Sequence, residues 1–401
     1  MILKKAHIVL FLFIVNSLVA ITSHIEFFGE LHTGIWRAVI TGATLPLLLV
    51  HIRTNDTTRL IFVLITYLFI VVLNNTNFLP SFSIYVGVVF SLLMYPVAFT
   101  YINSRTHYDI LYYIIIILLL LFGIHFIAAQ ILQYGPSPYM TGGAYLGGGG
   151  VQQTYVIVYL ILFLPFLLFA RDKKPEKLHI IVFVLSIAPV FLIFRRGAVF
   201  ALIAGFMVYV LMTPRRGRWM QFAIVTFILL IFLSPFYYQK LVNTIQHRPI
   251  DPAEFTEVGR TMELLTYIPE HLNNRGIVHN LFGSELYDYR TLAGVTRELH
   301  TDYATYMIGA GIIGFILYFS VILLIWLDFW KNISRVQDKF ARREIRAVLA
   351  ALTVAYVIIS YSGQFYVISS LSAIMLFFAI INRYTIEFAA QSETENQEVR
   401  S

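Results

Sequence analysis

Two adjacent arginines, Arg195 and Arg196, are the residues of this sequence whose chemistry most needs an explanation. They stand between two apolar runs that are each barely long enough to cross a bilayer, and Gly197 follows them. A planar guanidinium binds phosphate oxygens through two parallel hydrogen bonds, which a lysine cannot do. The pair therefore predicts a site for a doubly charged phosphate ligand. The alternative is that both side chains only anchor the chain to lipid phosphates.

A second arginine motif, Gly259-Arg260, lies later in the chain. It opens residues 259–272, whose apolar positions have near-helical spacing and predict a helix at the membrane surface. An arginine is unfavourable near a helix N-terminus, where acidic residues are preferred. We therefore expect Arg260 to be a second cation for the same phosphates. The alternative is that Arg260 pairs with Glu257 and Glu263.

A histidine, His300, precedes the tenth apolar run. Its unperturbed pKa near neutrality fits a general base. The alternative is an interfacial anchor, and position alone does not distinguish it from His247, His271 and His279 in the same segment. The glycines that follow, from Gly309 to Gly314, would let the next helix pack closely on its neighbours.

The chain that must position these residues has the composition of a membrane protein. Hydrophobic residues make up 58% of the 401 residues and charged residues 13%, with a mean hydropathy of +0.75. The apolar residues form long uninterrupted blocks, which indicates spanning α-helices and not the short alternating strands of a barrel. The net charge of +7 is typical of basic inner loops and gives no reason to expect nucleic-acid binding.

We predict an all-α polytopic protein with about twelve spans, forming one membrane domain over residues 1–401. The predicted spans are residues 6–21, 35–52, 60–73, 82–102, 110–132, 151–170, 178–194, 198–212, 220–236, 303–327, 347–360 and 365–381. The first run also has the basic start and apolar middle of a signal peptide. It lacks a clear small-residue cleavage site, and further spans follow it, which favours a retained helix.

The orientation follows from the positions of lysine and arginine. With Lys4-Lys5 inside, every second loop is basic, and the even number of spans places both termini in the cytoplasm. The basic inner segments are those around Arg53 and Arg59, at Arg105, and at residues 171–177, 215–218 and 331–346. The outer face then carries the Arg195-Arg196 link and a large loop at residues 237–302, which is too long to be a simple connection.

Four other segments and residue types bear on function. The glycine-rich residues 142–150 lack the Gly-Lys-Ser/Thr of a phosphate-binding loop and predict a mobile outer loop. Residues 331–346 predict a solvated helix at the anionic inner leaflet, and residues 391–401 a disordered tail. The sequence has no cysteine, which excludes disulfides and thiol chemistry, and no motif with metal-ligand spacing, so we expect no metal or other cofactor.

Together these motifs resemble the O-antigen ligase and O-antigen polymerase superfamily. The matching pieces are Arg196-Gly197, Gly259-Arg260, and His300 followed by the packing glycines Gly311 and Gly314. The resemblance covers residues 191–317. The chain departs from the family pattern at Arg195, where a serine is common, at Thr301, where an asparagine is common, and at Ala310, where an acidic residue is common.

The resemblance implies a GT-C-like glycosyltransferase in the bacterial inner membrane whose large periplasmic loop carries short helices. The donor would be a glycan on undecaprenyl diphosphate. Arg196 and Arg260 would bind the diphosphate, with Arg195 as a possible helper, and stabilise the charge that develops on it. His300 would orient or deprotonate the acceptor hydroxyl, which attacks the anomeric carbon with inversion. With arginines supplying the positive charge, no metal would be required.

Three functions stay open at this point. A ligase transfers the finished chain to lipid A-core, and we favour it narrowly because of the single large loop and the order of the motifs. A polymerase extends another lipid-linked repeat unit from the same donor. A transporter of lipid-linked glycans would place ionisable groups near the middle of the bilayer, and the predicted spans hold few, chiefly His125.

Overall fold

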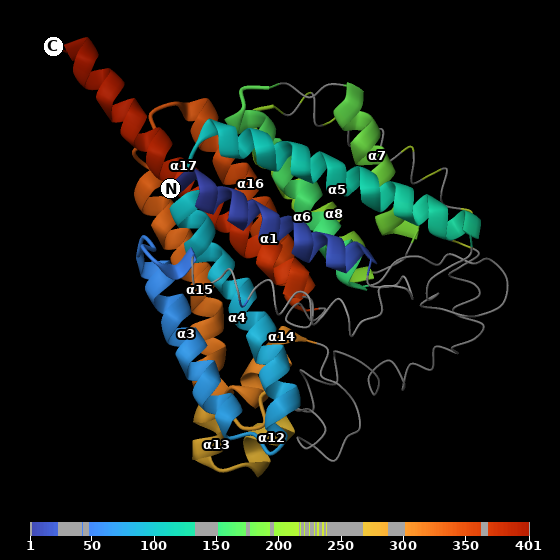
Figure 1. The fold of residues 1–401 in the computed structure, drawn as a ribbon, viewed down its shortest axis with the longest axis vertical. Helices are drawn as coiled ribbons and strands as arrows, with labels where there is room; N and C mark the ends of the chain where they lie inside the picture. Colours follow the sequence, from blue (N-terminus) through green and yellow to red (C-terminus); the bar gives the residue numbers. More distant parts are fainter. Residues whose placement is uncertain are drawn as a thin grey trace. The chain divides into compact units, whose positions relative to one another are not determined.

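The computed structural model describes residues 2–22, 48–132, 151–173, 177–192, 196–215, 268–287, 301–361 and 368–400, together with the single positions 42, 217, 220, 224, 228, 231, 235 and 238. Over these residues the chain is helical, and none of them forms a β-strand (Figure 1). Five of the described helices are long and apolar enough to cross a membrane. The prediction of an all-α protein with membrane-length helices is therefore confirmed for this part of the chain.

The helix bounds are as follows. The helices are α1 (Ile2–Thr22), α3 (Asp56–Leu73), α4 (Phe78–Tyr101), α5 (Arg105–Leu132), α6 (Val151–Ala170), α7 (Lys177–Leu192), α8 (Arg196–Met212), α12 (Ile268–Asn274), α13 (Ile277–Phe282), α14 (Asp302–Ala304), the π-helix η3 (Thr305–Gly309), α15 (Gly311–Ile333), α16 (Lys339–Ser360) and α17 (Ile368–Arg400). The count of about twelve spans stays a prediction, because residues 35–52 and 220–236 lie largely outside the described residues.

Two predicted segments differ from the structure. Residues 331–346 do not form one solvated helix: α15 ends at Ile333, and α16 begins at Lys339 after the Asp338 carboxylate accepts a hydrogen bond from the Phe340 N–H at 2.8 Å. An aspartate that caps the first free N–H groups starts a new helix at this point. Residues 391–400, predicted to be disordered, continue α17 as helix. They contain no glycine or proline that would end it.

The described helices fall into two compact units, each made of three separated chain segments. Unit 1 comprises Met1–Val50, Tyr101–Pro249 and Val336–Tyr356, and unit 2 comprises His51–Thr100, Ile250–Arg335 and Val357–Ser401. Because the chain passes repeatedly from one unit to the other, this division does not test the prediction of a single membrane domain.

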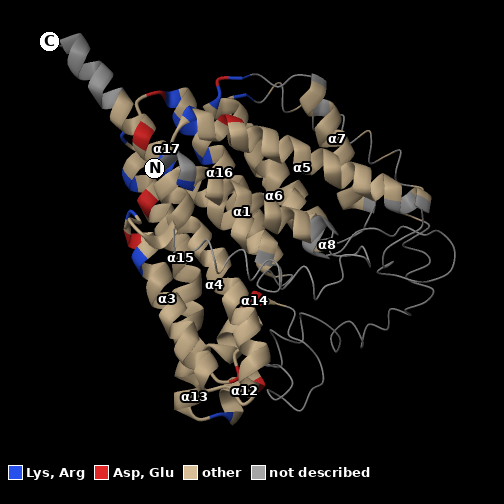
Figure 2. Ribbon diagram, viewed as in Figure 1, with Lys and Arg blue, Asp and Glu red and all other residues tan. Residues whose placement is uncertain are grey.

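In unit 2, a buried polar network joins α3, α4, α15 and the middle of α17. The Asp328 carboxylate accepts hydrogen bonds from Asn55 Nδ2 at 2.9 Å and from the Thr57 hydroxyl at 2.7 Å. The Tyr95 hydroxyl accepts from Asn55 Nδ2 at 3.2 Å and from Asn382 Nδ2 at 2.9 Å. Figure 2 shows that the charged residues of α3, α15 and α17 lie at this end, opposite α13. Basic residues predicted to be cytoplasmic therefore share one end of unit 2.

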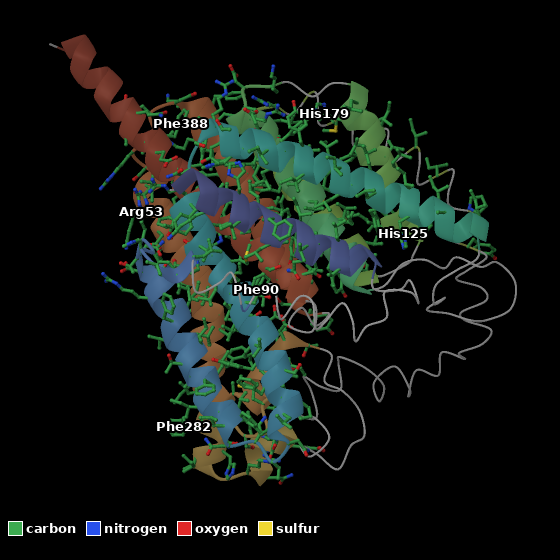
Figure 3. All side chains as sticks on the ribbon, viewed as in Figure 1. Arg53, Phe90, His125, His179, Phe282 and Phe388 are labelled. Atoms are coloured by element: carbon green, nitrogen blue, oxygen red, sulfur yellow. The ribbon has the colours of Figure 1, made fainter. Side chains whose placement is uncertain are left out.

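Unit 1 has an equivalent cluster where α5, α6 and α7 meet. The Arg171 side chain donates to the Asp109 carboxylate, and its guanidinium carbon lies 3.9 Å from the centre of the Tyr112 ring. The Tyr112 hydroxyl is 2.5 Å from Nε2 of His179, near the start of α7 (Figure 3). Arg105 donates to the Arg171 carbonyl at 3.1 Å. These residues belong to predicted inner segments, and in unit 1 they also share one end.

The Asp328 network predicts a large difference between two aspartates that both approach Lys331. Asp328→Ala leaves buried donors of Asn55 and Thr57 without an acceptor and should lower the free energy of unfolding by about 2–4 kcal/mol. Asp56→Ala removes an exposed ion pair to Lys331 at 3.0 Å and should leave stability close to that of the wild type. Denaturant titration in detergent micelles measures both. Equal effects of the two substitutions would contradict the role given to Asp328.

Candidate functional site

The residues predicted to carry the chemistry lie at the edge of the described chain or outside it. Arg195, Arg260 and His300 are outside the described residues. Arg196 is the first residue of α8, but its side chain is not among those described. The structure therefore does not test whether the four side chains meet. It does describe the elements that hold Arg196 and the chain directly after His300.

Helix α8, which begins at Arg196, is fixed in unit 1 along its length. A Cβ on Gly205 would lie 2.7 Å from Leu162 Cδ1 and 3.0 Å from the Ala351 carbonyl oxygen, so α8 packs closely on α6 and α16. At its other end, the hydroxyls of Tyr209 and Thr213 each donate to the Glu344 carboxylate at 2.5 Å. Burial raises the pKa of Glu344. These contacts set the rotation and height of α8, and hence the backbone position of Arg196.

The chain after His300 folds back along α15 in unit 2. The Tyr306 ring stacks on the Tyr318 ring with centroids 3.9 Å apart, and the Tyr303 ring lies parallel to that of Phe319 at 5.0 Å. The Tyr318 hydroxyl donates to the Asp302 carboxylate at 3.4 Å. Residues 302–309 therefore run antiparallel to the first turns of α15, with Asp302 level with Tyr318, about 10 Å from the start of that helix. Figure 1 shows α14 set back from α12 and α13 along unit 2.

This fold-back corrects the predicted tenth span, which was expected to run without a break over residues 303–327. The break lies at Gly311, which has φ +68°, a left-handed conformation that favours glycine. The Tyr67 hydroxyl donates to the carbonyls of Phe282 (Figure 3) at 3.0 Å and Ala310 at 2.7 Å. It therefore links the two segments that meet at the turn. Gly314 packs on the same ring: a Cβ there would lie 2.8 Å from Tyr67 Cε1. The predicted close packing of the glycines is thus confirmed.

The residues on either side of positions 288–300 are firmly anchored. Tyr287 is 4% exposed and its hydroxyl lies 3.4 Å from that of Tyr306. Thr301 is fully buried, and its hydroxyl accepts from the Ala304 N–H at 3.0 Å, which caps α14. Between α3 and α4, Asn75 donates to the Leu286 carbonyl at 2.5 Å, and Thr76 N–H donates to the Glu285 carboxylate at 3.0 Å. The chain that carries His300 is therefore fixed at both ends to unit 2.

An apolar pocket of about 520 Å³ adjoins the fold-back within unit 2. The Tyr303 hydroxyl, which donates to the Val357 carbonyl at 3.2 Å, connects two of its walls. The pocket is lined by Ile268, Tyr303, Met307, Phe315, Val357, Ile358 and Tyr361. Tyr303 and Met307 are one helical turn apart and share a face, so Asp302 and Thr305 lie on the opposite, buried side of the same segment.

The buried Asp302 is a candidate site residue that the sequence analysis did not select. It is fully buried, two positions after His300, within a tyrosine cluster formed by Tyr287, Tyr306 and Tyr318. An acidic residue at the border of an apolar run is a signal of function, because burying a carboxylate at membrane depth is costly. That signal was present in the sequence.

The structure also separates the histidines of the large loop. His271 lies on α12 and His279 on α13, two short helices at the end of unit 2 that holds the turn at Gly311. Burial, together with the positive charges of the neighbouring Arg275 and His279, lowers the pKa of His271 to about 4. A base this weak is poorly matched to proton transfer near pH 7. Of the predicted helix 259–272, only the residues from Ile268 onward are described, and these belong to α12.

Among the described residues, no group of three or more histidine or acidic side chains is placed to hold a metal ion. No known protein-family model matches the sequence, and no curated protein is significantly similar to it. The function therefore has to be argued from the geometry of the chain and from its motifs.

The turn at Gly311 predicts a sensitive glycine. Gly311→Ala would force a Cβ into a left-handed conformation and against the backbone of Leu281 and Gly283. It should lower the free energy of unfolding by about 2 kcal/mol or more, because the left-handed conformation alone costs about 1–2 kcal/mol. The matched control is Gly276→Ala, since Gly276 has φ −65° and nothing within 4 Å of a Cβ. Thermal unfolding in detergent measures both. Equal midpoints would show that the turn tolerates a side chain.

Proposed function

We propose that this protein is a metal-independent, inverting glycosyltransferase at the outer face of a bacterial cytoplasmic membrane. It transfers an oligo- or polysaccharide from undecaprenyl diphosphate to a sugar hydroxyl. The first candidate is an O-antigen ligase with lipid A-core as acceptor. The second is a repeat-unit polymerase with the same donor and a lipid-linked glycan as acceptor.

The fold-back of residues 302–309 is the observation that carries this proposal. It holds the chain directly after His300 in a buried position about 10 Å along α15, next to an apolar pocket of about 520 Å³. A polar backbone at membrane depth is tolerated where protein buries it or where it lines a cavity. The proposed donor has a polar diphosphate head and a long apolar isoprenoid chain. The apolar pocket suits the isoprenoid chain.

In the proposed reaction, Arg196 and Arg260 bind the diphosphate through paired hydrogen bonds, and Arg195 is a helper contact. His300 takes the proton from the acceptor hydroxyl while its oxygen forms a bond to the anomeric carbon. The bond from that carbon to the diphosphate oxygen breaks with inversion, and undecaprenyl diphosphate leaves with the electron pair. The arginines stabilise the negative charge that develops on the leaving group.

The proposed orientation places both termini and the charged ends of each unit in the cytoplasm. In unit 2 this end holds Arg53, Asp56, Asp328, Lys331 and Arg383. The opposite end holds α12, α13 and the turn at Gly311, which then face the periplasm. Basic residues concentrate on the cytoplasmic side of membrane proteins.

A transporter is less well supported. It would place ionisable groups near the bilayer midplane. In the membrane-length helices α3, α4, α5 and α15, acidic and basic residues lie near the helix ends, and His125 lies within α5 (Figure 3). In α17, the ion pair of Arg383 and Glu387 lies midway along the helix. The buried Asp302 lies on the fold-back and belongs to the candidate site.

The orientation can be tested with single cysteines, because the natural sequence has none. Glu270→Cys on α12 and Ser334→Cys after α15 both replace exposed residues. In intact cells, a membrane-impermeant maleimide reagent should label the cysteine at 270. It should label the cysteine at 334 only after the cells are permeabilised. Labelling in the reverse order would overturn the proposed orientation, and labelling of both in intact cells would place the two ends on the same side.

The site predicts which substitutions abolish transfer. Arg196→Ala, Arg260→Ala and His300→Ala should each reduce glycan transfer in cells to the level of the deletion strain, with normal amounts of protein in the membrane, while Arg195→Ala should be milder. Arg59→Ala, an exposed arginine at the opposite end of unit 2, is the control and should behave like the wild type. Near-normal transfer by any of the first three variants removes that residue from the site.

The deletion strain itself distinguishes the two candidate reactions. Accumulated lipid-linked long chains indicate that the ligation step was lost. Accumulated lipid-linked single repeat units indicate that polymerisation was lost. A strain with an unchanged pool of lipid-linked glycan would contradict both.

A further inference from the structure

The short helix α13 carries an exposed face of large apolar side chains. Ile277 is 77% exposed, Val278 67%, Phe282 50% and Leu281 37%, and no residue of α13 is buried. A helix of this length is not stable by itself in water, and in proteins such a helix depends on covering its apolar face. The apolar face of α13, formed by these four residues, therefore requires a surface that covers it.

The polar side chains beside this face are bonded inward, to the α12–α13 segment itself. Asn280 Nδ2 donates to the carbonyls of Leu272 at 2.7 Å and Arg275 at 3.3 Å, and the Arg275 guanidinium donates to the Ser284 hydroxyl. A helix on a water-covered surface has the opposite pattern, with polar side chains outside and apolar ones inside. The exposed His279 is the exception, and an amphipathic imidazole suits the headgroup level of a membrane. The pattern is that of a segment in contact with lipid.

The backbone contacts of α13 place its last turn at the depth of a membrane helix. The Tyr67 hydroxyl of α3 donates to the Phe282 carbonyl at 3.0 Å. Tyr67 lies about 9 Å before Leu73, the last residue of α3. With 18 residues, α3 is about 27 Å long, which is less than the roughly 30 Å of a hydrocarbon core. The chain bonded to Tyr67 therefore lies within the edge of the hydrocarbon and not above it.

The apolar face of α13 continues the exposed face of α3. Ile70 is one turn after Tyr67 on the same side of α3 and is 55% exposed, and Leu73 is 52% exposed. Because α3 is long and apolar enough to span the membrane, these side chains contact lipid tails. Figure 1 shows α13 beside this end of α3, where the Tyr67 bond holds it. The lipid that covers Ile70 and Leu73 can therefore cover α13 as well.

We propose that α13 is a membrane-inserted helix whose apolar face is covered by the acyl chains of the adjacent leaflet. Helices that lie in the membrane interface bury their apolar face about 5–10 Å into the boundary between headgroups and acyl chains, which agrees with the depth of Tyr67. This part of residues 237–302, predicted as an outer loop, then lies in the membrane. The proposal does not depend on the proposed glycosyl transfer.

The test places nitroxide spin labels on single cysteines, since the natural sequence has none. Val278→Cys and, as a second position, Ile277→Cys probe α13. Ile70→Cys is the lipid-facing control on α3, and Glu270→Cys on α12, which replaces an exposed charged residue, is the water-facing control. Each full-length variant is purified, labelled and reconstituted into phosphatidylcholine vesicles. Collisions of the label with oxygen, which concentrates in lipid, are compared with collisions with a water-soluble nickel complex.

The labels at positions 277 and 278 should collide more often with oxygen than with the nickel complex, in the same ratio as the label at position 70. The label at position 270 should show the reverse preference. Frequent nickel collisions at 277 and 278 would overturn the proposal, because the face would then stand in water. Few collisions with either reagent would also overturn it and would mean that a protein surface, such as a second copy of the chain, covers α13.

Discussion

The reversal of the chain at Gly311 is the constraint on which the candidate site depends. A helix that simply began at Tyr303 and crossed the membrane would leave His300 at the outer surface. The left-handed Gly311, the close approach of Gly283 and the two bonds from Tyr67 instead turn residues 302–309 back along α15. The Ala310 carbonyl at this turn accepts hydrogen bonds from the Tyr67 hydroxyl at 2.7 Å and from the Gly314 N–H at 3.2 Å.

The two ends of unit 2 use polar residues in different ways. At the proposed cytoplasmic end, the Asp328 carboxylate and the amides of Asn55 and Asn382 bond side chain to side chain across four helices. At the opposite end, Tyr67 and Asn75 bond to backbone carbonyls, and the Thr76 N–H donates to the Glu285 carboxylate. The first arrangement fixes helices against one another. The second ties the segments around Phe282, Leu286 and Ala310 to α3 and to the residues directly after it.

Sequence reasoning could predict the helices but not the fold-back. Long apolar runs and the positions of lysine and arginine are local signals, and they located most of the described helices. The break at Gly311 depends on Tyr67 and Gly283, which are far away in the sequence and meet only after folding. The burial of Asp302 could not be predicted either, because it depends on the stacking of Tyr306 on Tyr318 in the folded chain. The roles of Arg195, Arg196, Arg260 and His300 rest on their motifs, since their side chains lie outside the described part.

The fold-back also bears on why arginines, and not lysines, were expected at the outer link. In the proposed site, which adjoins the buried chain after His300, a phosphate head would lose hydration on entering. Two parallel hydrogen bonds from a guanidinium replace more of that hydration than the point charge of an ammonium group. The proposed site would therefore hold a diphosphate better with arginines than with lysines.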